Sequence, residues 1–140
     1  MERSITYCTE ELQKVWYEAE AKYRTLFPNL AQPFLTCTYR SSEEQNKLYN
    51  QPTDGLDNDK DGKIDEPDEC VTHAKGGQSY HNSYPSRAFD IAFKTKEGKL
   101  DWNLDNFKYF ANIVKSINPQ VIWGGNWSKK KRDNPHFELR

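Results

Sequence analysis

The sequence predicts a small α+β domain, in which an antiparallel sheet packs one face against helices and leaves the other face open. Large apolar residues occupy every second position at 88–93 and 135–139, which is the pattern of strands with one buried face. Apolar residues recur every three or four positions at 10–26 and 101–117, which is the pattern of amphipathic helices. A chain of this length fits one domain, so residues 1–140 are expected to form a single unit.

The N-terminal elements are expected to hold an arginine at a corner between a strand and a helix. Thr9 is a suitable N-cap for the first helix, and Pro28 ends that helix. A short strand at 33–39 then places Arg40 at its end. Ser41 and the glutamate three positions later form a capping box, so a second helix begins at once.

The C-terminal elements are expected to bring a glycine turn close to the functional residues. A third helix begins at Asp101 or Asn103 and closes before Pro119. A strand follows at 121–123. The adjacent glycines at 124–125 allow the backbone to approach other groups closely.

Composition and charge exclude several classes of protein. The net charge of −1 indicates no nucleic-acid partner, and no stretch approaches the roughly 18 apolar residues of a membrane span. The N-terminal residues lack the apolar run of a signal peptide, so we expect synthesis in the cytoplasm, and we expect a monomer. The three cysteines stand at irregular spacings that form neither a disulfide framework nor a CxxC zinc site.

Two histidines and an aspartate are spaced so that the fold can gather them around a metal ion. His81 lies nine positions before Asp90, and the alternation along 88–93 puts Asp90 on the open face of its strand. The same alternation puts His136 on the open face of the last strand, and Asp133 precedes it by three positions as a carboxylate in reserve. Zinc with three protein ligands keeps a fourth position for water and lowers the pKa of that water to about 7. The pattern therefore predicts a hydrolytic zinc centre.

Two other residues bear on this centre. His73 is the alternative first ligand if His81 lies elsewhere. Cys37 is expected in the strand that leads to Arg40, which can bring its sulfur close to the metal.

An acidic segment at about 53–70 matches the DxDxDG pattern of a calcium-binding loop. Asp57 takes the first ligand position, and Gly62 takes the sharp turn at the sixth. Position twelve is an aspartate where a long glutamate is usual, and Pro67 stops an exit helix, so we expect an isolated loop and not a full EF-hand. Bound calcium would order the segment that leads to His81. The expected calcium ligands are Asp57, Asp59, Asp61, the carbonyl of Lys63, Asp65 and Asp68.

The order of these features resembles the zinc peptidases grouped with D-alanyl-D-alanine dipeptidases and carboxypeptidases, and within them the phage L-alanyl-D-glutamate endopeptidases. The resemblance covers about residues 33–50 and 76–140 and is interrupted by the calcium-like loop. The interval from His81 to Asp90 is longer than in many relatives, which changes the substrate rim at 82–87. The motifs are the strand–Arg40–helix corner, Ser79-x-His81, Ala88-x-Asp90, Trp123-Gly124-Gly125-x-Trp127 and Asp133-x-x-His136.

The resemblance implies a fold like that of hedgehog domains and D,D-peptidases, and a role for each matching residue. Asp133 would be the general base that takes a proton from the attacking water and passes it to the leaving amine. Arg40 would polarise the scissile carbonyl or steady the oxyanion. The zinc ligands would be His81, Asp90 and His136, and the residues in contact with ligands or substrate would be Ser79, Glu138, Trp123 and Trp127.

The activity implied by the resemblance is hydrolysis of an amide bond in bacterial peptidoglycan, at the L-alanyl-D-glutamate bond of the stem peptide. A phage endolysin of this kind would be made in the host cytoplasm and released by a holin to act on the cell wall. One alternative is a D,D-carboxypeptidase that removes terminal D-alanine, with Arg87 holding the free carboxylate. The other is a non-catalytic, calcium-regulated module that binds the cell wall.

Overall fold

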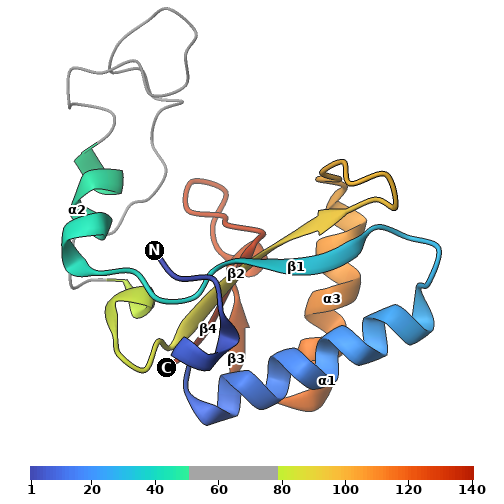
Figure 1. The fold of residues 1–140 in the computed structure, drawn as a ribbon, viewed down its shortest axis with the longest axis horizontal. Coiled ribbons are helices and arrows are strands. Elements are labelled where there is room, and N and C mark those ends of the chain that lie inside the picture. The colour runs from blue at the N-terminus through green and yellow to red at the C-terminus, as the bar shows by residue number, and fades with distance from the viewer. Residues whose placement is uncertain (51–78) are drawn as a thin grey trace, which may run out of the picture.

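The computed structural model describes residues 1–50 and 79–140 as an antiparallel sheet with helices on one face (Figure 1). The four strands follow the order β1-β2-β4-β3, and every neighbouring pair is antiparallel. This architecture confirms the predicted α+β class. The strands are β1 (Gln32–Cys37), β2 (Ala88–Lys94), β3 (Val121–Trp123) and β4 (His136–Leu139).

Two helices cover the apolar face of the sheet, and another lies apart from them (Figure 1). Helices α1 (Glu10–Leu26) and α3 (Leu104–Ile117) pack on the same face and against each other. Helix α2 (Ser42–Asn50) follows the end of β1 and stands away from both. Short 3-10 turns in the described part of the chain are η1 (Ile5–Tyr7), η4 (Tyr80–Asn82) and η5 (Gly124–Asn126).

Side-chain caps fix where the helices begin. Thr9 accepts a hydrogen bond from the backbone N–H of Leu12 at 3.3 Å, as expected for the N-cap of α1. At α2, Ser41 Oγ accepts from the N–H of Glu44 at 3.1 Å, and the Glu44 carboxylate accepts from the N–H of Ser41 at 3.2 Å. This is the predicted capping box. At α3, the side-chain oxygen of Asn103 accepts from the backbone N–H of Asp105 at 3.0 Å.

Strand β1 ends earlier than the sequence predicts. The strand that was expected to reach Tyr39 stops at Cys37, after a register shift between Leu35 and Cys37. Beyond that point the chain pairs with the N-terminal segment. Thr38 donates its N–H to the carbonyl of Glu2 at 2.7 Å, and Glu2 donates to the carbonyl of Tyr39 at 2.8 Å. The backbone leaves the sheet because its hydrogen-bonding partner changes.

The core between the sheet and the helices is built largely from aromatic rings. Phe110 of α3 is fully buried at its centre. Its ring centroid lies 5.8 Å from that of Trp16, 6.2 Å from that of Tyr23 and 5.5 Å from that of Phe137. Tilted and edge-on contacts of this kind add to the free energy gained by burying the rings. Phe110 therefore contacts α1 and the sheet from α3 and links all three in one core.

Some features predicted from the sequence lie outside the described residues. These are the alternative ligand His73 and the calcium-like loop at about 53–70, so both stay predictions. In the part of the chain that the structure describes, no helix is long and apolar enough to cross a membrane. The expected calcium ligands Asp57, Asp59, Asp61, Lys63, Asp65 and Asp68 all belong to the loop.

Replacing the central core ring should destabilise the domain strongly. We expect Phe110→Ala to lower the free energy of unfolding by about 3 to 5 kcal/mol, because it removes buried surface and leaves a cavity. Lys108→Ala is the matched control on the exposed side of the same helix, and its effect should stay within about 0.5 kcal/mol. Chemical denaturation followed by circular dichroism measures both. Equal stability of the two variants would contradict the central place given to Phe110.

Candidate metal centre

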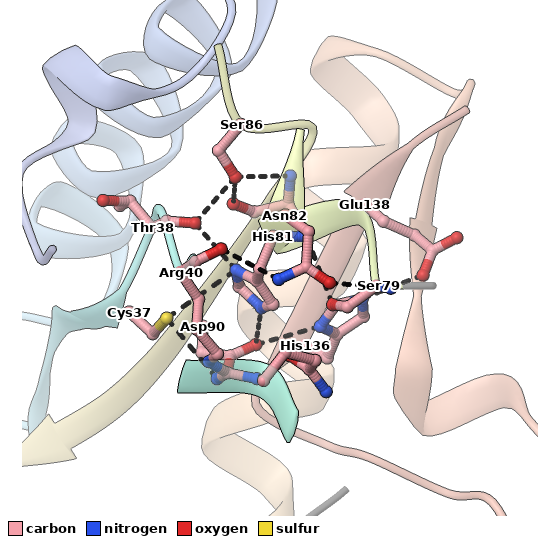
Figure 2. Close-up of polar contacts among 12 residues, drawn as sticks. Cys37, Thr38, Arg40, Ser79, His81, Asn82, Ser86, Asp90, His136 and Glu138 are labelled. Atoms are coloured by element: carbon pink, nitrogen blue, oxygen red, sulfur yellow. Dashed lines mark hydrogen bonds and ion pairs between the residues drawn. The ribbon is translucent and has the colours of Figure 1, made fainter. Parts of the chain in front are cut away.

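Asp90 lies at the middle of the open face of the sheet. It belongs to β2, which has β1 on one side and β4 on the other. Its backbone pairs with Cys37 of β1 and with His136 of β4. Because directly paired residues of antiparallel strands point to the same face, both side chains lie beside the Asp90 carboxylate. Figure 2 shows this convergence.

His81 reaches Asp90 from the turn η4. Ser79 caps this turn, with its Oγ accepting from the backbone N–H of His81 at 3.2 Å, and Asn82 completes a capping box. The His81 ring is buried, and its Nδ1 lies 2.8 Å from the carbonyl oxygen of Thr38. A carbonyl oxygen can only accept, so Nδ1 carries the proton. The other nitrogen, Nε2, points to Asp90 Oδ1 at 3.2 Å.

His136, the first residue of β4, is oriented by a carboxylate. Glu138 lies two residues later on the same face, and its Oε1 is 2.8 Å from His136 Nε2. Arg140 donates to Glu138 Oε2 at 2.7 Å. Burial opposes ionisation, yet the hydrogen bonds from His136 and Arg140 hold the pKa of Glu138 below its usual value. The remaining nitrogen of His136, Nδ1, lies 3.0 Å from Asp90 Oδ1.

Two imidazole nitrogens thus face a single carboxylate oxygen. In a neutral imidazole one nitrogen donates and the other accepts, and here Thr38 and Glu138 already use the donor of each ring. The accepting nitrogens of His81 and His136 would then both meet Asp90 Oδ1, which is itself an acceptor. Two added protons or one divalent cation would resolve this conflict. Two imidazoles and a carboxylate are a donor set that suits zinc, so these residues fit that ion.

A cysteine extends the cluster. Among the described residues, Cys37, His81 and Asp90 offer ligand atoms that all lie within 4.8 Å of one another. His136 joins this group through Asp90, and its ring centroid lies 5.1 Å from that of His81. Cys37 therefore lies next to the proposed metal ligands, where the sequence analysis expected it.

The Asp90 carboxylate shifts the pKa of each imidazole toward the charged form, and each imidazole does the same for Asp90. Burial lowers the pKa of His81, but the negative charge of Asp90 outweighs burial and raises the pKa of His81 to about 10. Burial likewise opposes protonation of His136, and its bonds to Asp90 and Glu138 raise that pKa to about 9. Burial also disfavours ionised Asp90, yet the charge of His81 and the hydrogen bonds hold its pKa well below the usual range. The site therefore favours positive charge at both imidazoles.

Arg40 stands beside the cluster with only 7% of its surface exposed. Its Nη1 donates to Gln45 Oε1 at 2.7 Å, which fixes the guanidinium from α2. Its Nη2 lies 3.8 Å from Asp90 Oδ2 and donates to Cys37 Sγ at 3.5 Å. Its Nε is buried without a hydrogen-bond partner among the described residues. A fixed, permanent cation with a spare donor suits an oxygen atom of a substrate.

Asp133 is held next to the cluster by the glycine turn. Its N–H donates to the carbonyl of Gly124 at 3.0 Å. A Cβ atom at position 124 would lie 2.3 Å from the carbonyl oxygen of Asp133, so only glycine permits this approach. Burial and the negative charge of Asp90 raise the pKa of Asp133 to about 6, while His136 and His81 oppose that rise. The carboxylate is therefore within electrostatic reach of the imidazoles and of Asp90.

Comparison with known proteins identifies the family. Residues 72–139 match the family model of D-alanyl-D-alanine carboxypeptidases. The peptidoglycan L-alanyl-D-glutamate endopeptidase CwlK of Bacillus subtilis is 32% identical over 114 aligned residues, and the match covers 75% of this chain and 59% of CwlK. The chain belongs to the D-alanyl-D-alanine carboxypeptidase family. It spans somewhat more than half the length of this curated relative.

Two solved structures share the fold of this family member. The L-Ala D-Glu endopeptidase ChiX of Serratia marcescens has a TM-score of 0.63 at 20% identity, over 97% of this chain and 83% of ChiX. The vancomycin-resistance D,D-pentapeptidase VanY, solved as a mutant with Zn(II), has a TM-score of 0.63 at 12% identity, over 94% of this chain and 72% of VanY. At these identities the likeness shows the fold alone.

The other predicted site residues of this family member act at different distances from the centre. Trp127 packs on His136, with the ring centroids 5.3 Å apart. Trp123 instead donates its Nε1–H to the carbonyl of Asn134 at 2.7 Å, which braces the loop before β4. Ser79 acts through its cap on the turn of His81. The structure adds residues that sequence reasoning missed, and these are Thr38, Gln45 and Arg140.

Weakening the carboxylate behind His136 should weaken zinc binding. We expect Glu138→Gln to lower zinc affinity about 10- to 100-fold, because the amide holds the Nε2–H of His136 less strongly than the carboxylate does. Glu97→Gln, on an exposed turn, is the charge-matched control and should bind zinc like the unaltered chain. Titration with a zinc-competing indicator dye measures both affinities. Equal affinity of the two variants would show that Glu138 does not orient a metal ligand.

Proposed function

We propose that the chain is a zinc-dependent peptidase that cleaves the L-alanyl-D-glutamate bond in peptidoglycan stem peptides. The observation that carries this proposal is the pair of buried imidazole nitrogens that face Asp90, with Asp133 beside them. The name of CwlK states this activity for a relative of 32% identity, which supports the choice of bond. We extend the proposal to cell-wall lysis, as by a phage endolysin, because the sequence motifs resemble those enzymes.

The site residues divide the chemistry among them. His81, Asp90 and His136 would hold the zinc ion, which when bound supplies Lewis acidity for the hydrolysis. Asp133 takes the proton of the attacking water on its carboxylate and delivers it to the leaving amine nitrogen. Arg40 directs guanidinium donors to the scissile carbonyl oxygen as negative charge builds there.

Removal of terminal D-alanine is the alternative reaction for this site. That reaction needs a cation for the free carboxylate, and Arg87 is the candidate from the sequence. The Arg87 Nε donates to the carbonyl of Leu139 at 3.1 Å, and its Cζ lies 5.8 Å from the ring centroid of Tyr80. The Arg87 guanidinium therefore contacts the end of β4 and the ring of Tyr80.

Digestion of purified muropeptides tests which bond is cut. We expect mass spectrometry to show stem peptides that have lost L-alanine with the attached sugar and that begin with D-glutamate. The reaction should stop when zinc is chelated and resume when zinc is returned, because the bound ion would supply the Lewis acidity that the hydrolysis needs. Release of free D-alanine as the main product would instead establish the carboxypeptidase.

Removing the proposed general base should abolish turnover and spare the metal. We expect Asp133→Asn to lower kcat about 10²- to 10⁴-fold, since the amide cannot accept the proton. Zinc content, measured by atomic emission, should be unchanged because Asp133 is not among the proposed ligands. Asp105→Asn, an exposed acid in the first turn of α3, is the control and should keep full activity. Full activity of Asp133→Asn would remove this residue from the mechanism.

A further inference from the structure

We propose that residues 129–132 bind carboxylates of the stem peptides in peptidoglycan and so hold the chain on a polymeric substrate. The identity of the polymer rests on the proposed function. The proposal adds an interaction surface beside the metal centre. The four residues, called the basic loop below, are Lys129, Lys130, Lys131 and Arg132.

The basic loop begins and ends beside the metal centre. Trp127, two positions before it, packs on His136 with the ring centroids 5.3 Å apart, and Asp133 follows it directly. One oxygen closes the base of the loop, because the carbonyl of Gly124 accepts from the N–H of Trp127 at 3.2 Å and from that of Asp133 at 3.0 Å. A residue adds at most about 3.6 Å of chain. Every residue of the basic loop is therefore within about 11 Å, measured along the chain, of Trp127 or Asp133.

The side chains of the basic loop present positive charge to solvent. All four are exposed. Within the described part of the chain, none of them forms an ion pair. The whole chain has a net charge of −1, so the loop is a local concentration of positive charge and not part of a generally basic surface. Figure 1 shows this segment, in orange-red, rising from the sheet on the side away from α1.

The proposed substrate supplies matching negative charge. A glutamate inside a peptide uses its amino group and one carboxyl group in amide bonds, so it keeps a second carboxyl group. A stem peptide with an L-alanyl-D-glutamate bond thus has a carboxylate next to that bond, and neighbouring stem peptides repeat it. Clustered cations attract such a repeating anion, and attraction of this kind raises the rate of encounter by about 10- to 1000-fold.

Salt sets the range over which this attraction acts. Charges exposed to solvent interact over a Debye length, which is about 8 Å at 0.15 M ionic strength and about 30 Å at 0.01 M. A single exposed ion pair contributes little, so binding depends on several contacts made together. The basic loop therefore favours a polymer over one short peptide, and added salt should weaken that preference.

Sedimentation with purified, insoluble peptidoglycan tests the proposal. The full chain carries Asp133→Asn in this assay, so that the polymer is not digested, and this form is the parent. Adding Lys129→Gln, Lys130→Gln, Lys131→Gln and Arg132→Gln together gives the loop variant. At about 0.01 M salt the loop variant should bind at least about tenfold more weakly than the parent, and at about 1 M salt the difference should vanish.

A matched control removes the same number of positive charges elsewhere. It combines Lys96→Gln, Lys99→Gln, Lys108→Gln and Lys115→Gln, which change exposed lysines in the turn after β2 and on α3. This control should bind like the parent, and circular dichroism should show that all variants are folded. Binding as weak as that of the loop variant would mean that net charge governs the interaction, which would overturn the proposal.

Modified polymers identify the anion that the basic loop binds. Chemical amidation of the carboxyl groups should lower binding of the parent to the level of the loop variant. Removal of phosphate-containing wall polymers should leave binding of the parent unchanged. Binding that survives amidation, or that is lost together with the phosphate polymers, would overturn the assignment to stem-peptide carboxylates.

The outcomes separate this inference from the proposed function. Sedimentation involves no turnover, whereas the digestion of muropeptides decides which bond is cut. Equal binding of the parent and the loop variant at about 0.01 M salt would overturn the role of the basic loop and leave the proposed cleavage in place. Release of free D-alanine, with binding still dependent on the loop, would overturn the proposed bond and support the loop.

Discussion

A carboxylate enclosed by cationic groups is the interaction on which the rest of the site depends. The Asp90 side chain is only 19% exposed, and a carboxylate in such a place would become neutral if it had no partners. His81, His136 and Arg40 all approach it, from a turn, from a neighbouring strand and from the corner before α2. Each of the three is fixed in turn by a group outside the cluster. The arrangement of the open face is thus the arrangement that satisfies one anion.

The packing on the other face of the sheet makes this arrangement rigid. Phe89, Ile91 and Phe93 of β2 are fully buried against the helices, which fixes both the position and the register of the strand. Side chains alternate along a strand, so a slip by one residue would move Asp90 into the apolar core and a phenylalanine into the site. The aromatic core and the polar centre therefore specify each other through the same seven-residue strand.

Much of this could be predicted from the sequence because it depends on local periodicity. Alternation alone assigns Asp90 and Glu138 to the open face, and the capping box at Ser41 locates the corner of Arg40. The contacts that depend on distant segments could not be predicted. The end of β1 at Cys37 depends on pairing with the N-terminal segment, and the hydrogen bond from Arg140 to Glu138 depends on which way a long side chain turns. The pattern of residue types along the sequence predicts neither of these two contacts.

The hydrogen bond between His81 Nδ1 and the carbonyl of Thr38 has a consequence for mutagenesis. The acceptor is a main-chain atom, and the same oxygen also accepts from the hydroxyl of Ser86 at 2.6 Å. Exchanging the side chain at position 38 leaves that oxygen in place. An alanine scan would therefore not reveal that the carbonyl of Thr38 selects the tautomer of His81. The contribution of this hydrogen bond to the orientation of the His81 ring can be measured only by altering the backbone. An amide-to-ester exchange, which makes the carbonyl a weaker acceptor, is one such change.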